Sequence, residues 1–163
     1  MRISISPLLL LFLIVIIHSS GYDPKIARVL AYMSYNAYES QDAINNWSCD
    51  KCSKFPLKSV KAGAVQGADL QWFSGYSTDL KAIIISFRGS SSIANWIINL
   101  STDLVSYPKC SGCQVHRGFF TSWQLAQTAL LNRVNSLRSL YRNVPIYVTG
   151  HSMGGALAAL SVC

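Results

Sequence analysis

The sequence has few charged residues, few histidines and no apolar run long enough to span a bilayer. Charged side chains make up 13% of the 163 residues, and aromatic side chains make up 11%. Disordered chains combine high net charge with few aromatic residues, so this composition excludes an intrinsically disordered protein. The 14 lysine and arginine residues give a net charge of +7, but they are scattered along the chain. Nucleic-acid binding requires a clustered basic face, so no nucleic-acid partner is expected.

The longest apolar run is Leu8–Ile17, which follows Arg2 and precedes the small residues Ser19–Gly21. A membrane-spanning helix needs about 20 apolar residues. A secretory signal peptide has a basic start, an apolar core of about 7–15 residues and a small-residue cleavage site. We therefore predict that residues 1–21 are a signal peptide, that residues 22–163 form one domain, and that the protein is secreted.

The five cysteines form two closely spaced pairs and one single residue: Cys49 and Cys52, Cys110 and Cys113, and Cys163. Residues 53–109 separate the pairs, whereas zinc ribbons separate theirs by about 15–20 residues. A secreted chain also folds in an oxidising compartment. We expect a disulfide within each pair, with zinc binding as the alternative. Cys163 is either a buried thiol or half of a disulfide whose partner lies beyond this sequence.

Two sequons, Asn46-Trp47-Ser48 and Asn99-Leu100-Ser101, are candidate acceptors for N-glycosylation in a secreted chain.

The hydrophobic pattern predicts alternating strands and helices. Apolar side chains recur every three or four residues in 24–40 and 119–141, which predicts two amphipathic helices. Strands are predicted at 64–77, 81–87 and 145–149, loops at 41–61 and 101–113, and a helix from Gly154 onward. The runs at 81–87 and 145–149 are rich in β-branched and apolar residues, as expected for buried strands. The order strand, helix, strand predicts an α/β fold with a parallel sheet.

The segment Gly150-His151-Ser152-Met153-Gly154 carries the strongest functional signal. Gly-x-Ser-x-Gly between a buried strand and a helix is the pattern of a nucleophile elbow. The turn is so tight that side chains two residues either side of the serine would collide with the chain, so both positions are glycine. The helix that follows favours negative charge developing near its N-terminus. Ser152 is therefore the candidate nucleophile.

Two histidines remain after the predicted signal peptide, His116 and His151. The residue before an elbow serine points to the other side of the strand, so we interpret His151 as a packed structural residue. A structural role is also expected for His116, because the triad on this type of elbow follows the chain order Ser, Asp or Glu, His.

Three segments in this order, IIISFRGSSSIANWIINL, VHRGFF and VTGHSMGGALA, resemble the fungal-type class 3 lipase family of α/β-hydrolases. The resemblance runs from about Tyr22 to the C-terminus. It implies that Ser152 is the nucleophile and that the backbone N–H groups of Ser90 and Met153 form the oxyanion hole. It also implies a Cys49–Cys52 disulfide, as in some members, and no metal or other cofactor.

The same resemblance implies that the apolar segment after FRGS is an interfacial lid. Its apolar face comprises Ile93, Trp96, Ile97 and Leu100. Ala94 and Asn99 replace charged residues that are common in the fungal lids, so lid opening by ion pairing is not expected here. An apolar lid suits a lipid–water interface.

Family triads end with an Asp and a His well downstream of the serine, but residues 153–163 contain no Asp, Glu or His. We therefore expect the N-terminal part of an α/β-hydrolase, truncated after the elbow helix, with a natural short form that lacks hydrolase activity as the alternative. The expected function is hydrolysis of acylglycerols by a secreted serine ester hydrolase. The alternatives are a soluble feruloyl-type esterase of the same family and a non-catalytic secreted protein that binds lipid surfaces.

Overall fold

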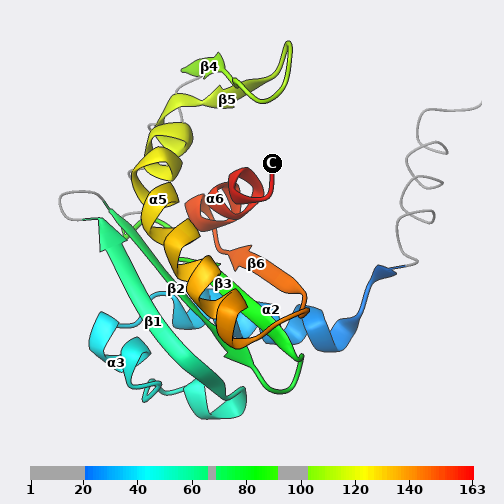
Figure 1. The fold of residues 1–163 in the computed structure, drawn as a ribbon. Helices are drawn as coiled ribbons and strands as arrows, with labels where there is room; N and C mark the ends of the chain where they lie inside the picture. Colours follow the sequence, from blue (N-terminus) through cyan, green and yellow to red (C-terminus); the bar gives the residue numbers. More distant parts are fainter. Residues whose placement is uncertain (1–20, 66–68, 92–102) are drawn as a thin grey trace, which may run out of the picture.

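A computed structural model of the chain describes residues 21–65, 69–91 and 103–163, and its centre is a four-stranded mixed sheet (Figure 1). The strands are β1 (Leu57–Val65), β2 (Leu70–Ser77), β3 (Ala82–Phe87) and β6 (Ile146–Gly150), in the spatial order β1-β2-β3-β6. Neighbours among the first three strands are antiparallel, and β6 is parallel to β3. The predicted parallel strand–helix–strand unit is confirmed for β3 and β6, and β1 and β2 add an antiparallel part to the sheet.

Helices cover both faces of this sheet. α2 (Pro24–Asn36) and the short α3 (Gln41–Asn45) lie on one face, while α5 (Arg117–Leu140) and α6 (Met153–Ser161) lie on the other (Figure 1). The six residues of β3 are all buried, and they alternate between the two cores. Ile83 and Ile85 pack toward α5 and α6, whereas Ile84 packs toward α2, because successive side chains of a strand point to opposite faces.

Local sequence signals explain where the two long helices begin. The carboxylate of Asp23 accepts hydrogen bonds from the N–H groups of Lys25 and Ile26, and Pro24 follows it at the first helical position of α2. His116 precedes α5, and its Nδ1 accepts a hydrogen bond from the N–H of Gly118. The structural role expected for His116 is therefore a helix cap.

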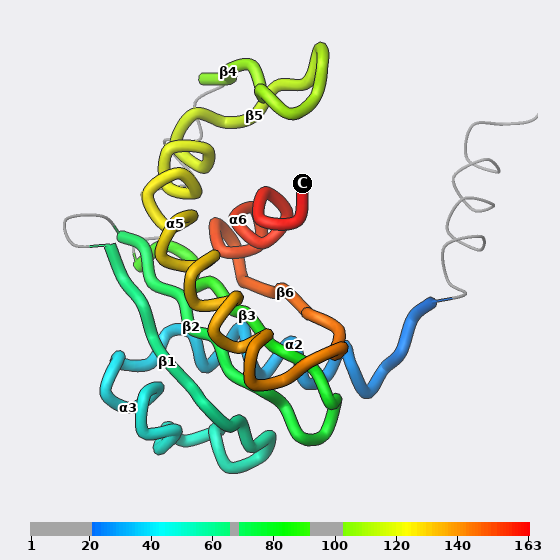
Figure 2. The backbone as a smooth tube through the Cα atoms, in the orientation of Figure 1, coloured from blue at the N-terminus to red at the C-terminus, as the bar shows by residue number. Residues whose placement is uncertain are grey.

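Between β3 and β6 the chain forms a small two-stranded hairpin before it enters α5 (Figure 2). Its strands are β4 (Leu104–Ser106) and β5 (Gln114–His116), which pair in antiparallel register. The sequence predicted a loop over 101–113. The hairpin was missed because each of its strands is only three residues long.

β6 is half-buried rather than buried, in contrast to the prediction. Among the described residues it pairs with β3 alone and forms one edge of the sheet. A cavity of about 280 Å³ lies beside it, lined by residues of α5, β6 and the end of α6, including Val134, Val148 and Val162.

The opposite edge of the sheet is β1, which the sequence analysis placed partly in a loop. Lys58 and Lys61 point to solvent, while Leu57 and Ala62 are buried. The register shifts between Lys58 and Lys61, and Ser59 has a positive φ of 50°. This bulge breaks the alternation of polar and apolar residues that would have predicted the strand.

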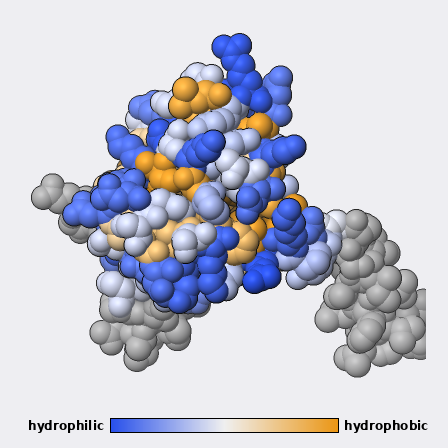
Figure 3. All heavy atoms as spheres, turned by 90° about the horizontal axis from the view of Figure 1, so that it is seen from below, coloured by the Kyte–Doolittle hydropathy of each residue, from blue (hydrophilic) through white to orange (hydrophobic). Residues whose placement is uncertain are grey.

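No helix within 21–65, 69–91 and 103–163 is long and apolar enough to cross a membrane. Seen from below the view of Figure 1, the surface is mainly hydrophilic, and its apolar residues lie in separate small groups (Figure 3).

Candidate active site

The candidate nucleophile lies in the turn between strand β6 and helix α6. β6 ends at Gly150 and α6 begins at Met153, which leaves Ser152 at the centre of the turn. Its backbone has φ 55° and ψ −124°, a combination that side-chain-bearing residues rarely adopt. Such a conformation costs about 1–3 kcal/mol and persists only where the surrounding structure holds it. Ser152 is exposed to solvent in this conformation.

Two glycines allow the turn because other backbone atoms approach them closely. A Cβ atom on Gly150 would collide with the carbonyl group of Gly154. A Cβ atom on Gly154 would collide with the carbonyl oxygen of Phe87 and would lie 2.9 Å from that of Arg88. The steric reason predicted for the Gly-x-Ser-x-Gly spacing is confirmed, and the turn packs directly against the end of β3.

Helix α6 starts immediately after Ser152. The Ser152 carbonyl oxygen accepts hydrogen bonds from the N–H groups of Gly155 at 2.9 Å and Ala156 at 3.4 Å, and the second of these is the α-helical type. The first N–H groups of a helix have no partner within the helix and carry partial positive charge. Met153, the first residue of α6, is 6% exposed. Its N–H group therefore lies at the N-terminus of α6, the end of a helix that stabilises negative charge, next to Ser152.

The segment that follows β3 lies against the elbow. A Cβ atom on Gly89 would lie 2.7 Å from the carbonyl oxygen of His151 and 3.2 Å from Cβ of Ser152. Ser90, the other residue of the expected oxyanion hole, is only 4% exposed. The structure thus brings together Ser152, Met153 and the 88–91 segment, which are separated by about sixty residues in the sequence.

Helix α2 fixes the opposite side of the elbow through side-chain hydrogen bonds. The hydroxyl groups of Ser34 and Thr149 lie 2.8 Å apart and share a hydrogen bond. The hydroxyl of Ser86 donates to the Met33 carbonyl oxygen at 3.0 Å. These contacts connect the end of α2 to the two parallel strands just before the site.

The sequence analysis expected His151 to be a packed residue. In the structure it is exposed to solvent. Its Nδ1 lies 2.8 Å from the hydroxyl of Tyr38, with which it shares a hydrogen bond. The pair lines a surface cavity of about 350 Å³, together with Ala31, Ser34 and Tyr35. Strand β6 forms the edge of the sheet, so no further described strand covers this side of the turn.

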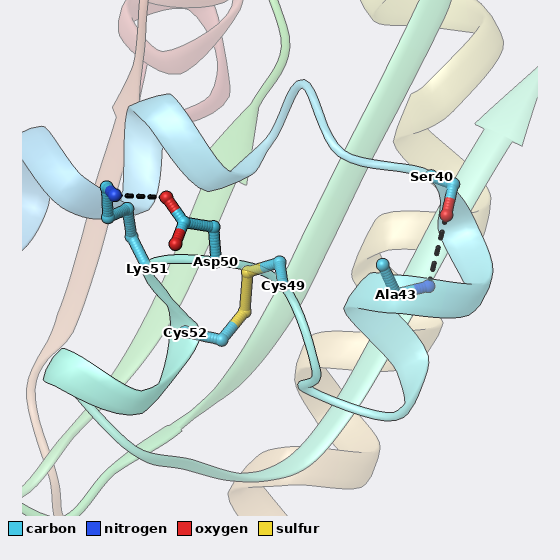
Figure 4. The surroundings of a disulfide bond; sticks show 6 residues. All are labelled: Ser40, Ala43, Cys49, Asp50, Lys51 and Cys52. Atoms are coloured by element: carbon cyan, nitrogen blue, oxygen red, sulfur yellow. Dashed lines mark hydrogen bonds and ion pairs between the residues drawn. A yellow bond between two sulfur atoms is a disulfide. The ribbon is translucent and has the colours of Figure 1, made fainter.

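Both predicted disulfides are present. Cys49–Cys52 lies in the loop between α3 and β1, and Cys110–Cys113 closes the turn of the β4–β5 hairpin. Next to the first disulfide, Lys51 forms an ion pair with Asp50, and the hydroxyl of Ser40 accepts the Ala43 N–H to cap α3 (Figure 4).

Cys163 is an exposed free thiol rather than a buried one. In the part of the chain that the structure describes, no cluster of three or more His, Cys, Asp or Glu side chains could hold a metal ion.

Several expectations fall outside the described residues. They include the signal peptide apart from Gly21, all four apolar lid residues (Ile93, Trp96, Ile97 and Leu100), and the Asn99 sequon. The other sequon is described, and its Asn46 is exposed just after α3.

Comparison with known proteins identifies the family. Residues 84–163, which include most of β3, the 88–91 segment and the elbow, match the family described as lipase (class 3). A lipase of Rhizomucor miehei is 40% identical over 115 residues. The chain belongs to the class 3 lipase family. A secreted mono- and diacylglycerol lipase of Gibberella zeae is a further relative, 34% identical over 148 residues.

The solved structures agree with this class 3 lipase assignment and show the α/β-hydrolase fold. The Rhizomucor miehei triacylglyceride lipase superimposes with a TM-score of 0.75 and 34% identity, covering 86% of this chain and 55% of that chain. A triacylglycerol lipase with a serine protease triad as its catalytic centre gives a TM-score of 0.74 and 36% identity over the same shares.

The matches cover only part of these lipases. The alignments take in 70% of this chain and 32% of the Rhizomucor miehei lipase, and 77% and 35% for the Gibberella zeae enzyme. The chain therefore spans about a third of the length of the curated class 3 lipases that it matches.

Sequence reasoning missed two residues that contact the candidate site, Asp69 and Tyr38. The hydroxyl of Ser90 donates to the carboxylate of Asp69 at 2.8 Å, and Tyr38 contacts both Gly89 and His151. Neither residue lies in a motif, and no periodicity marks them. Only the folded chain brings them to the elbow.

Proposed function

We propose that this protein is a secreted serine ester hydrolase that cleaves acylglycerols, with Ser152 as its nucleophile. The observation that carries the proposal is the strained, exposed conformation of Ser152 between β6 and α6, with the 88–91 segment packed beside it. A fold retains such strain where the surroundings over-determine it, and these sites are often functional.

The chemistry follows the geometry of the elbow. The Ser152 hydroxyl attacks the ester carbonyl carbon, and the carbonyl oxygen gains negative charge as the tetrahedral intermediate forms. The backbone N–H groups of Ser90 and Met153 stabilise that oxyanion. Collapse of the intermediate releases the alcohol and leaves an acyl group on Ser152, which water then removes.

The reaction also requires a base for the Ser152 proton. In a Ser-His-Asp triad a histidine accepts that proton, and a carboxylate orients the histidine. His151 is hydrogen-bonded to Tyr38, and His116 caps α5, so we assign neither as this base. A triacylglycerol lipase that this chain matches over 55% of its length has a serine protease triad as its catalytic centre, and we propose the same type of triad for Ser152.

Acylglycerols are the proposed substrates because the relatives named above are acylglycerol lipases. The proposed lid, whose apolar residues are Ile93, Trp96, Ile97 and Leu100, suits a lipid–water interface. These relatives favour an acylglycerol lipase over a feruloyl-type esterase and over a non-catalytic lipid-binding protein. Secretion is proposed from the apolar leader and from relatives named as secreted lipases.

The proposal is tested by removing the nucleophile from the whole natural protein. Ser152→Ala should abolish hydrolysis of both a soluble short-chain ester and emulsified triacylglycerol. Ser139→Ala is the matched control, since Ser139 is an exposed serine of α5 whose hydroxyl bonds only within its own helix. Full activity of the Ser152→Ala variant would refute the assignment.

A further inference from the structure

Asp69 lies at the same end of the sheet as the elbow, although it is far from Ser152 in sequence. It immediately precedes β2, which runs antiparallel to β3. The start of β2 therefore lies beside the end of β3, and the Arg88 N–H donates to the Gln71 carbonyl oxygen at 2.9 Å. This pairing places Asp69 next to the segment 88–91.

Four donors from that short segment converge on the Asp69 carboxylate. Arg88 forms an ion pair with Oδ1. Oδ2 accepts hydrogen bonds from the Ser90 hydroxyl at 2.8 Å, the Ser91 N–H at 2.6 Å and the Ser91 hydroxyl at 3.0 Å. Hydrogen bonds to an ionised group are shorter and stronger than those between neutral groups. Arg88, Ser90 and Ser91 are thus all held by one anion.

These contacts hold one side of the 88–91 segment. The other side of the segment is fixed by the close approach of Gly89 to His151 and Tyr38. With Arg88 and Ser91 both held, the peptide between Gly89 and Ser90 has little freedom to rotate. Stabilisation of an oxyanion depends on donors that are aimed before the reaction begins.

We infer that Asp69 is a positioning residue for ester hydrolysis, whose carboxylate holds the 88–91 segment so that the Ser90 N–H points to the oxyanion. The inference rests on the proposed function of Ser152. Asp69 itself touches no reacting atom. It acts through Ser90 and Ser91.

The ionisation state of Asp69 is consistent with this role. Partial burial alone would raise its pKa, but the hydrogen bonds from the Ser91 N–H and from the hydroxyls of Ser90 and Ser91, together with Arg88, lower the pKa below its usual value. Asp69 is therefore an anion at neutral pH. Among the described residues, Arg88 is the charged side chain that forms an ion pair with Asp69.

The test compares Asp69→Asn with wild type in the whole natural enzyme. The amide keeps the shape of the side chain but loses the charge. With a soluble short-chain ester, kcat should fall about 10–100-fold, because a misaligned oxyanion donor costs that much, while KM changes less than about twofold. Asp103→Asn is the control, since Asp103 also forms an ion pair, with Arg117, at the start of α5. It should leave kcat and KM unchanged.

A second readout does not depend on activity. Backbone amide exchange at Ser90 and Ser91 should become faster in Asp69→Asn and stay unchanged in Asp103→Asn. If wild type hydrolyses no ester, the proposed function fails, but the exchange rates still test the contact with Asp69. Wild-type kcat in Asp69→Asn, an equal loss in Asp103→Asn, or unchanged exchange at both serines would overturn the inference.

If Asp69→Asn does not fold, the Ser91→Ala variant tests the same inference. It removes one of the two Ser91 hydrogen bonds to Asp69 and leaves the charge and the backbone contact in place. We expect a fall in kcat of a few-fold with unchanged KM, smaller than in Asp69→Asn. A rise in KM with unchanged kcat would contradict the positioning role.

Discussion

Two neighbouring glycines of the elbow helix should respond in opposite ways to the same substitution. Both Gly154 and Gly155 lie in the first turn of α6. A methyl group on Gly154 would collide with the Phe87 carbonyl oxygen and would lie 2.9 Å from the Arg88 carbonyl oxygen. A methyl group on Gly155 would meet only the Gly150 carbonyl oxygen, at 3.4 Å, which is an ordinary van der Waals contact.

The size of each effect follows from these contacts. Overpacking costs about 1–3 kcal/mol in general. The atoms facing Gly154 are backbone atoms at the end of β3, which cannot rotate away, so Gly154→Ala should lower the free energy of unfolding by about 3 kcal/mol. Gly155→Ala should raise it by about 0.5–1 kcal/mol, because alanine favours the helix over glycine.

Thermal unfolding of the whole enzyme measures both changes. For a domain of this size, Gly154→Ala should lower Tm by about 10 °C, whereas Gly155→Ala should raise it by a few degrees. Gly154→Ala should also lose most of its ester hydrolysis below its Tm, because α6 and Ser152 must move away from β3. Equal stability of the two variants would refute the close packing of the elbow on β3.

Three further outcomes are expected. His151→Gln should keep ester hydrolysis within about fivefold of wild type, because its Nδ1 is bonded to Tyr38; loss of activity comparable to that of Ser152→Ala would make His151 the base. The pKa of Asp69 is lower in the folded protein than in the unfolded chain, where it is about 3.9. The ionised carboxylate therefore stabilises the fold above pH 3.9, and this stabilisation is lost as the pH falls through the pKa of the folded state. Urea unfolding of wild type and Asp69→Asn should therefore differ most at neutral pH and converge in acid, and a constant difference would contradict the assignment. Trp96→Ser should reduce hydrolysis of emulsified triacylglycerol much more than that of a soluble ester, and equal losses would place Trp96 in an ordinary core.

The features that the sequence predicted correctly are those that depend on local chemistry. The apolar run 81–87 became β3, the helical period of 119–141 became α5, and the glycine spacing around Ser152 became a tight turn. The cysteine pairs became disulfides because three residues of separation allow each pair to close. In each case, the residues that carry the signal are also the residues that form the structure.

The features that the sequence did not predict depend on contacts between distant segments. Most of β1 was missed because its bulge breaks the alternation of residues and because its outward lysines also resemble a polar loop. Such lysines are typical of an edge strand, where charge prevents pairing with other chains. β6 was expected to be a buried strand but is half-buried, because no described strand pairs with it on the side away from β3. Asp69 reaches the elbow only through the pairing of β2 with β3.

The most direct test of the central claim is the site of covalent labelling by an organophosphonate ester in the whole natural enzyme. The account predicts stoichiometric modification at Ser152, located by mass spectrometry of the peptide that contains it, with complete loss of ester hydrolysis. The Ser152→Ala variant should remain unlabelled, while Ser139→Ala should be labelled like wild type. Labelling of a different serine, with hydrolysis retained in Ser152→Ala, would contradict the account.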